Sequence, residues 1–214
     1  MKFWTPSPLW DGQPCYIIGG GPSLRGFPFD SLSGEFVLGC NAAFLLGADV
    51  VPITVFGDAS FLVKHREQLV AYVAEGGMVV TNSGRLKKSI PVWLRSMKKV
   101  LKGLSLDGLG WNGNTGASAI NLALLLGANP IYLLGYDMGL DEKGRTNYHD
   151  AYRAHKVHPS TYPRFLKGMT YLARDLPLMF PGRQVINLED GTSKLDVFPK
   201  ESLKAHLAEM EVSV

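Results

Sequence analysis

The sequence is poor in cysteine, in excess charge of one sign and in long apolar runs. Its 214 residues include two cysteines, Cys15 and Cys40, which are too few for a disulfide framework and are typical of buried thiols in a reducing compartment. The net charge of +3 is too small to indicate nucleic-acid binding. No stretch approaches 18 uninterrupted apolar residues, and residues 1–14 lack the apolar core of a signal peptide. We therefore expect a cytoplasmic protein with no membrane span and no nucleic-acid partner.

Two familiar nucleotide-binding motifs are also missing. The P-loop pattern Gly-x-x-x-x-Gly-Lys-Ser/Thr does not occur. The glycine-rich stretch at 19–24 has Leu24 where the dinucleotide motif Gly-x-Gly-x-x-Gly needs its third glycine. About 20 residues further on, Asn41 stands where that fold usually places a ribose-binding carboxylate. Both departures disfavour NAD as a ligand.

The most informative stretch that is present joins an apolar run to a glycine turn. Residues 15–18 (Cys-Tyr-Ile-Ile) are typical of a buried strand, and Gly-Gly-Gly-Pro-Ser follows at 19–23. Pro22 suits the first turn of a helix, so the order is strand, glycine turn, helix N-terminus. This arrangement can hold a phosphate, because glycines let backbone N–H groups approach a ligand closely. It equally suits a tight turn without a ligand, so the turn alone leaves both interpretations open.

Short apolar runs alternate with helical patterns along the whole chain. Strands are predicted at 15–18, 36–38, 53–56, 78–81, 131–134 and 184–187, and helices at 60–75, 117–126, 164–176 and 201–209. The basic segment 85–107 is predicted to be solvated surface with one strand near 99–103. The alternation predicts an α/β fold that is Rossmann-like, with a mostly parallel sheet and helices on both faces. We expect residues 1–214 to form a single nucleotide-binding domain with a lid-like loop at 140–162.

Polar residues and glycines follow the predicted strands. Parallel sheets bind ligands beyond the carboxyl ends of their strands, so these residues are expected to gather at one rim. Purely structural strands also end in turn-forming residues, which weakens the argument. The residues expected at the rim are Gly19, Gly20, Gly21, Pro22, Ser23, Asn41, Asp58, Asn82, Ser83, Asn114, Thr115, Gly116, Tyr136 and Asp137.

The same motifs, taken in order, resemble a Rossmann-like superfamily. It contains the bacterial CMP-sialic-acid sialyltransferases and the 6-hydroxymethylpterin diphosphokinase-like proteins, many of them encoded by phages. The resemblance covers roughly residues 15–176 and rests on four motifs: Gly-Gly-Gly-Pro-Ser-Leu at 19–24, Cys-Asn at 40–41, Asn-Thr-Gly at 114–116 and Ile-Tyr-Leu-Leu-Gly-Tyr-Asp at 131–137. It implies a glycosyltransferase-like enzyme that takes a sugar nucleotide of the CMP-sugar type and transfers the sugar to an unidentified acceptor.

The resemblance also implies roles for individual residues. The glycine turn at 19–23 and Asn41 would contact the nucleotide, and the helix start at 114–116 would bind the donor. Tyr148 matches a tyrosine that holds the donor phosphate, whereas Tyr136 stands where the sialyltransferases have Ile. His158 matches the general base, because it lies a few residues before a predicted helix.

Some residues depart from the sialyltransferase pattern and leave other functions open. Gly20 and Asp58 each replace an Asn, and Asp58 with Asp137 is closer to the diphosphokinase, which uses ATP and Mg²⁺. That enzyme's His-Gly-Asp-Asn signature is absent, since Asn-Ser-Gly follows the strand at 78–81. Mg²⁺ held by Asp58 and Asp137 is therefore the one candidate cofactor. A nucleotide-binding module without catalysis is the third alternative, and self-association of the chain is left open.

Three histidines fall in the lid-like loop: His149, His155 and His158. Each can be a base, a ligand or a surface residue. A structural zinc site is disfavoured, because Asp150 is the only neighbouring carboxylate and no cysteine is near. A neutral imidazole near pH 7 is suited to deprotonating an acceptor hydroxyl. His158 is the first choice for this role and His149 the second.

Overall fold

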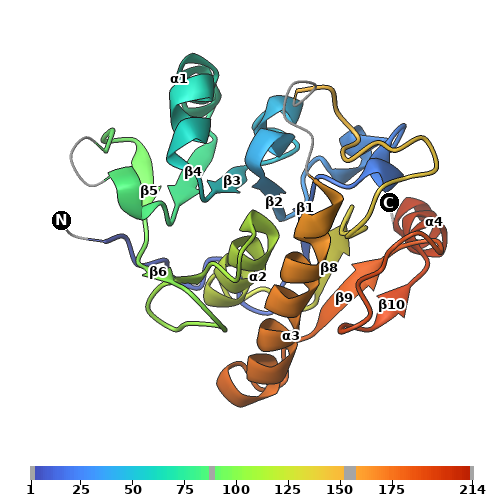
Figure 1. Ribbon diagram of the computed structural model, residues 1–214. Helices are drawn as coiled ribbons and strands as arrows, with labels where there is room; N and C mark the ends of the chain where they lie inside the picture. The colour runs from blue at the N-terminus through green and yellow to red at the C-terminus, as the bar shows by residue number, and fades with distance from the viewer. Residues whose placement is uncertain (1–2, 87–89, 152–157, 213–214) are drawn as a thin grey trace.

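The protein is seen in a computed structural model that describes residues 3–86, 90–151 and 158–212. Eight strands form one sheet in the order β10-β9-β8-β1-β2-β3-β4-β5, and every pairing in it is parallel (Figure 1). This confirms the predicted α/β class with a parallel sheet. The strands are β1 (Cys15–Ile18), β2 (Val37–Cys40), β3 (Ile53–Phe56), β4 (Met78–Thr81), β5 (Leu94–Ser96), β8 (Ile131–Leu134), β9 (Val185–Leu188) and β10 (Lys200–Glu201).

In the part of the chain that the structure describes, four α-helices pack on the sheet (Figure 1). They are α1 (Ala59–Ala74), α2 (Thr115–Leu125), α3 (Tyr162–Met179) and α4 (Leu203–Val212). Short 3₁₀ turns follow β1 and β2 at η1 (Pro22–Leu24), η2 (Phe29–Leu32) and η3 (Asn41–Leu46). The predicted strand at 99–103 is shorter than expected: β6 (Lys99–Val100) pairs with β7 (Leu109–Gly110) in a separate two-stranded sheet.

Alternate residues of β1 show that helices cover both faces of the sheet. Cys15 and Ile17 belong to the core that contains α2 and α3, whereas Tyr16 and Ile18 pack with residues of η1, η2 and α4. A third cluster joins α1 to the face that carries Ile18. This alternation follows from the two-residue period of a strand. The predicted placement of helices on both faces is confirmed.

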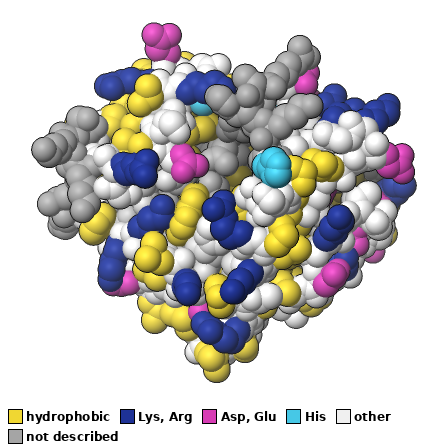
Figure 2. All heavy atoms as spheres, viewed as in Figure 1, with side chains coloured by type: hydrophobic (Ala, Val, Ile, Leu, Met, Phe, Trp, Pro, Cys, Tyr) yellow, Lys and Arg dark blue, Asp and Glu magenta, His cyan; other side chains and the backbone are white. Residues whose placement is uncertain are grey.

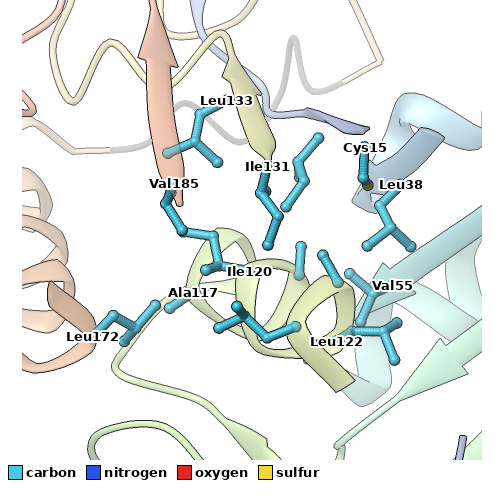
Figure 3. Close-up of a cluster of buried hydrophobic side chains, with 14 of the residues drawn as sticks. Cys15, Leu38, Val55, Ala117, Ile120, Leu122, Ile131, Leu133, Leu172 and Val185 are labelled. Atoms are coloured by element: carbon cyan, nitrogen blue, oxygen red, sulfur yellow. The ribbon is translucent and has the colours of Figure 1, made fainter. Parts of the chain in front are cut away.

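The central helix α2 is almost completely buried, as its apolar sequence predicts. Figure 3 shows Ile120 and Leu122 of α2 packed among side chains of the neighbouring strands, including Ile131 of β8 and Val55 of β3. The predicted buried state of the two cysteines is also confirmed, and burial raises the pKa of the Cys40 thiol to about 12. Among the described residues, no helix combines the length and the apolar character needed to cross a membrane.

The strand order reverses between β1 and β8. Successive strands β2 to β5 lie on one side of β1, and β8, β9 and β10 lie on the other. At such a switch point the connections leave in opposite directions, which opens a crevice beyond the carboxyl ends of the two strands. The turn after β1 and the turn after β8 therefore meet at the place where an α/β sheet is expected to bind a ligand.

Candidate functional site

A cavity of about 900 Å³ lies at this switch point. Its volume is at the upper end of the range for pockets that hold one small ligand, so a nucleotide leaves room to spare. The residues predicted from the sequence that line it are Gly19, Gly20, Gly21, Asn41, Asp58, Asn114, Thr115, Gly116 and Tyr136. Pro22, Ser23 and Asp137, also predicted as nucleotide-binding residues, are not part of its lining.

The glycine turn after β1 is clamped to the end of β8. Gly19 N–H donates to Leu134 O at 2.8 Å, and Gly21 N–H donates to Gly135 O at 2.9 Å. A Cβ atom on Gly21 would lie 2.5 Å from Gly135 O, a distance that no side chain tolerates against backbone. A Cβ on Gly20 would meet only Asn147 Oδ1, at 3.0 Å. Packing therefore requires glycine at 21, whereas Gly20 leaves the turn open on the side of the cavity.

Asp137 fastens this turn through Ser23. Its carboxylate accepts from Ser23 N–H at 2.8 Å and from Ser23 Oγ at 2.5 Å. Burial raises the pKa of Asp137, and the two Ser23 hydrogen bonds oppose that effect only in part. Asp137 and Ser23 thus hold the glycine turn from outside the cavity. The predicted roles of Ser23 and Asp137 in nucleotide binding stay predictions.

The N-terminus of α2 forms the adjoining part of the cavity. The side chain of Asn114 caps the helix, with Oδ1 accepting from Ala117 N–H at 2.8 Å. Its Nδ2 atom is buried and has no hydrogen-bond partner among the described residues. Thr115 Oγ1 donates to Asn41 Oδ1 at 3.4 Å, which links α2 to the end of β2. A helix N-terminus favours an anion, so this end of α2 suits a negatively charged group of a ligand.

The backbone around the cavity contains two unusual residues. Asn41 and Met138 both line it and have positive φ angles, 52° and 53°. Side chains disfavour this left-handed region, and residues held there cluster at functional sites. These torsions favour a binding site over a simple turn at the ends of β2 and β8.

Two cationic side chains line the cavity that the sequence analysis did not predict as site residues. Lys64 of α1 and Arg164 of α3 line it, whereas Asp58 is its one carboxylate among the described lining residues. This balance favours an anionic ligand. The position of Arg164 in the sequence does point to a role in binding. A cation in the first turn of a helix opposes the helix dipole, so its presence there indicates a function other than helix stability. On the face shown in Figure 2, Lys and Arg side chains are spread over the surface around α3.

The segment after β7 brings part of the basic region near the cavity. Trp111 lines the cavity, and Lys99 Nζ lies 4.0 Å from the centre of its ring. Burial lowers the pKa of Lys99, while the nearby Asp58 carboxylate raises it. A cation over an aromatic face is attracted to it. The predicted solvated surface at 85–107 thus includes a contact with the cavity wall.

Tyr136 contributes a ring whose hydroxyl group is already engaged. Its O–H donates to Gly116 O at 3.1 Å, and Cys40 Sγ lies 3.9 Å from the same oxygen. Burial raises the pKa of the Tyr136 phenol well above its ordinary value. Tyr136 therefore remains a neutral phenol that ties β8 to α2 and β2.

The predicted lid-like loop lies against the glycine turn. Thr146 and Asn147 line the cavity, and Tyr148 N–H donates to Gly20 O at 3.1 Å. The ring of Tyr148 packs against Phe29, with 5.0 Å between the ring centres, and is not part of the cavity lining. The loop is thus attached to the predicted nucleotide site. Its closure over a ligand and the contact of Tyr148 with a phosphate stay predictions.

The loop histidines are placed differently from one another. His158 is exposed, bonds Ser160 Oγ through Nδ1 at 2.7 Å and does not line the cavity. His149 is half-buried, and burial lowers its pKa. His155 lies outside the described residues. The structure therefore does not bring the first-choice base to the cavity, and its catalytic role stays a prediction.

No magnesium cluster is apparent in the described ranges. Asp58 lines the cavity, whereas Asp137 accepts hydrogen bonds from Ser23. Residues 3–86, 90–151 and 158–212 hold no group of three or more His, Cys, Asp or Glu side chains arranged to bind a metal ion. Two carboxylates can still hold Mg²⁺ with bound phosphates and water. The magnesium site stays a prediction that depends on both aspartates.

Comparisons with known proteins support the fold. The chain matches no protein-family model and no curated protein sequence. Its fold is similar to the sialyltransferase CstII from Campylobacter jejuni in complex with the substrate analogue cytidine-5'-monophosphate, at 11% identity and a TM-score of 0.55, covering 89% of this chain and 85% of that one. An alanine variant of CstII in complex with CMP gives 11% identity and a TM-score of 0.57, over 88% and 86% of the two chains. CstII in complex with a trisaccharide acceptor and CMP gives 14% and 0.50, over 87% and 85%.

At these identities the likeness shows the fold alone. It agrees with the sialyltransferase part of the resemblance found in the sequence. The diphosphokinase part, the phage origin, the cytoplasmic location, the single-domain organisation and self-association stay predictions.

Proposed function

We propose that the chain is a nucleotide-dependent transferase of the glycosyltransferase type, which uses a sugar nucleotide of the CMP-sugar class. The observation that carries the proposal is the cavity at the switch point between β1 and β8. There an open glycine turn, a helix N-terminus and two cations face one space. The fold likeness to a transferase that binds CMP supports the choice of nucleotide.

Different lining residues would bind different parts of the sugar nucleotide. Gly20 and the α2 N-terminus at Thr115 would hold the phosphate, with Arg164 as its charged partner. Asn41 and Asn114 would contact the nucleoside through their amide groups. The carbohydrate part would occupy the remaining space toward α1.

The reaction is a displacement at the anomeric carbon. An acceptor hydroxyl gives its proton to a base while its oxygen bonds to that carbon. The bond from the carbon to the phosphate oxygen breaks, and CMP leaves with the electron pair. His158 is the base predicted from the sequence, with His149 as the second choice. Replacing the base with Gln should reduce turnover and leave CMP affinity unchanged. Turnover that survives replacement of His149, His155 and His158 together would exclude the loop histidines as the base.

A thermal-shift screen tests the nucleotide class. The protein is heated with CMP, CDP, UDP, GDP, ATP or NAD, each with and without Mg²⁺. A ligand at a hundred times its dissociation constant stabilises by about 2.7 kcal/mol, which is readily measured. We expect a shift with CMP that does not need metal.

The other outcomes separate the alternatives. A shift with ATP that requires Mg²⁺ would favour the diphosphotransferase with Asp58 and Asp137 as ligands. Tight CMP binding with neither transfer nor hydrolysis of a CMP-sugar would favour a binding module without catalysis. No shift with any nucleotide would overturn the proposal.

A further inference from the structure

The outward side of α3 carries a stripe of basic, aromatic and apolar residues. Its members are spaced three or four residues apart and therefore lie on one side of the helix: Arg164, Lys167, Tyr171, Arg174 and Leu178. The opposite side of α3 packs on the core. Figure 2 shows this part of the surface, where Lys and Arg side chains lie around α3 with hydrophobic side chains between them. At 1.5 Å per residue the stripe is about 20 Å long, which is enough for an extended contact.

The loop between β6 and β7 lies beside this stripe. Leu104 N–H donates to Asp175 Oδ2 at 3.0 Å, which attaches the loop to α3. Lys102 Nζ lies 5.8 Å from the centre of the Tyr171 ring. Lys102 and its neighbour Leu101 are both exposed, so they widen the surface that begins on α3.

The positive charge of this surface is only partly neutralised by the chain itself. Arg174 pairs with Asp175. Within residues 3–86, 90–151 and 158–212, Lys102, Arg164 and Lys167 form no ion pair. Cations gathered on one face repel one another and attract anions from solution. The surface is therefore complementary in charge to an anionic partner.

Two large apolar side chains stand among these cations. Leu101 is 71% exposed, and Leu178, which follows Arg174 by one helical turn, is 77% exposed. Cations alone are sufficient to attract a soluble polyanion, and exposed leucines add nothing to that attraction. Basic residues together with exposed leucines suit the surface of a bilayer, because the cations bind anionic headgroups and the leucines enter the acyl boundary.

We propose that this surface, here called the α3 face, docks the protein on a membrane that contains anionic lipids. The residues that would contact the lipids are Lys167, Tyr171 and Leu178 of α3 with Leu101 and Lys102 of the neighbouring loop. Docking of this kind needs no membrane-spanning helix. It is independent of which nucleotide the cavity binds, so the docking and the proposed function are tested separately.

Sedimentation with lipid vesicles tests the role of the charges. We expect wild-type protein to bind vesicles of phosphatidylcholine with phosphatidylserine and not vesicles of phosphatidylcholine alone. Lys102→Gln with Lys167→Gln should weaken this binding about twenty-five-fold, since each cation near an anionic surface contributes about five-fold. Arg66→Gln with Lys204→Gln is the matched control. It removes the same charge from α1 and α4, which pack on the other face of the sheet, and should bind as wild type does.

A second pair of substitutions tests the contact with the acyl boundary. Leu101→Ser with Leu178→Ser leaves the charge unchanged and removes both exposed leucines from the α3 face. Binding to the phosphatidylserine vesicles should weaken by about ten-fold for each leucine. Val63→Ser, at an exposed position of α1, is the control and should have no effect. Thermal denaturation of every variant shows that it is folded.

Three results would overturn the proposal. The first is wild-type protein that does not bind vesicles containing phosphatidylserine. The second is an equal loss in the lysine variant and its charge-matched control, because binding would then follow net charge and not the α3 face. The third is a leucine variant that binds as tightly as wild type, because the α3 face would then attract anions in general, as it would an acidic protein.

Discussion

Two groups of residues that line the cavity differ in kind: one follows the strand ends and begins α2, and the other belongs to α1. The wall formed by residues 19–21, 114–116 and Tyr136, here called the strand-end wall, is mostly backbone at the ends of buried elements. Its hydrogen bonds are largely internal, as in the contact of Gly21 N–H with Gly135 O. The opposite wall is formed by Ser60, Phe61, Lys64 and His65 of α1 and is here called the α1 wall. In it, the buried His65 Nε2 has no hydrogen-bond partner within the described chain.

This difference separates stability from recognition. Packing fixes most of the strand-end wall, so a change at a packed position such as Gly21 alters the fold as well as ligand binding. The α1 wall keeps an unsatisfied group, which costs stability and is typical of residues kept for function. We therefore expect substitutions at the tightly packed positions of the strand-end wall, such as Gly21, to destabilise the protein, and those among the charged and polar side chains around the rest of the cavity to change affinity alone.

The largest effect should follow from closing the glycine turn. In Gly21→Ala the new Cβ would lie 2.5 Å from Gly135 O, so β1 and β8 must separate. The free energy of unfolding should fall by about 3 kcal/mol, as for overpacking in a core. Urea denaturation measures this change. Gly20→Ala is the matched control, because its Cβ would meet only the end of a side chain, and equal losses in the two variants would contradict the account.

A smaller effect, on affinity alone, is expected at Arg164. Arg164→Gln removes a cation from the cavity and should weaken CMP binding about twenty-fold, the worth of a charged hydrogen bond. It should not lower the free energy of unfolding, because a cation in the first turn of α3 opposes the helix dipole. Calorimetric titration at low and high salt measures it. Arg174→Gln is the control on the same helix, since Arg174 pairs with Asp175 and is not part of the lining. Equal losses in both variants would indicate a general charge effect and remove Arg164 from the site.

Asn114 is expected to contribute both to stability and to CMP affinity, and two substitutions separate these contributions. Asn114→Ala removes the cap of α2 and should cost about 1 kcal/mol of stability as well as CMP affinity. Asn114→Ser keeps a capping oxygen and removes Nδ2, so stability should be retained while affinity falls. Thermal denaturation and titration of both variants test this. If Asn114→Ser binds CMP as the wild type does, Nδ2 has no part in binding.

The smallest effect is a change in pH dependence at Asp137. Burial raises the pKa of this carboxyl in the folded protein above its value in the unfolded chain. Its contribution to stability is therefore fully present below the unfolded pKa and is lost as pH rises through the folded pKa. Relative to Asp137→Asn, wild type should become less stable as the pH rises above the ordinary carboxyl pKa of 3.8. Parallel stability curves for the two proteins, measured by urea denaturation across this range, would contradict the assignment.

The same contrast explains how much the sequence could predict. The strands β1, β3, β4 and β8 match their predicted residues, because each is a run of four mostly apolar, β-forming residues. The edge strands β5 (Leu94–Ser96) and β10 (Lys200–Glu201) were missed, since two or three residues with charged side chains carry no such pattern.

The residues of the strand-end wall could be predicted because they directly follow strands that the sequence identifies. Parallel strands end at one edge of the sheet, so the residues that follow them meet whatever their separation in the chain. The α1 wall was not predicted. Phe61, His65 and Leu69 are spaced four residues apart, and this spacing predicts the buried face of a helix. Arg164 reaches the cavity where α3 packs beside α2. Its place in the first turn of a helix is unusual for a cation, but nothing in the local sequence tells which element it faces.

Calorimetric titration of the wild-type protein with CMP in the presence of EDTA tests whether the cavity binds this nucleotide without metal. We expect one CMP to bind per chain, with an affinity that does not depend on divalent metal. Absence of CMP binding in EDTA, or CMP binding that returns only when Mg²⁺ is added back, would contradict the proposed function.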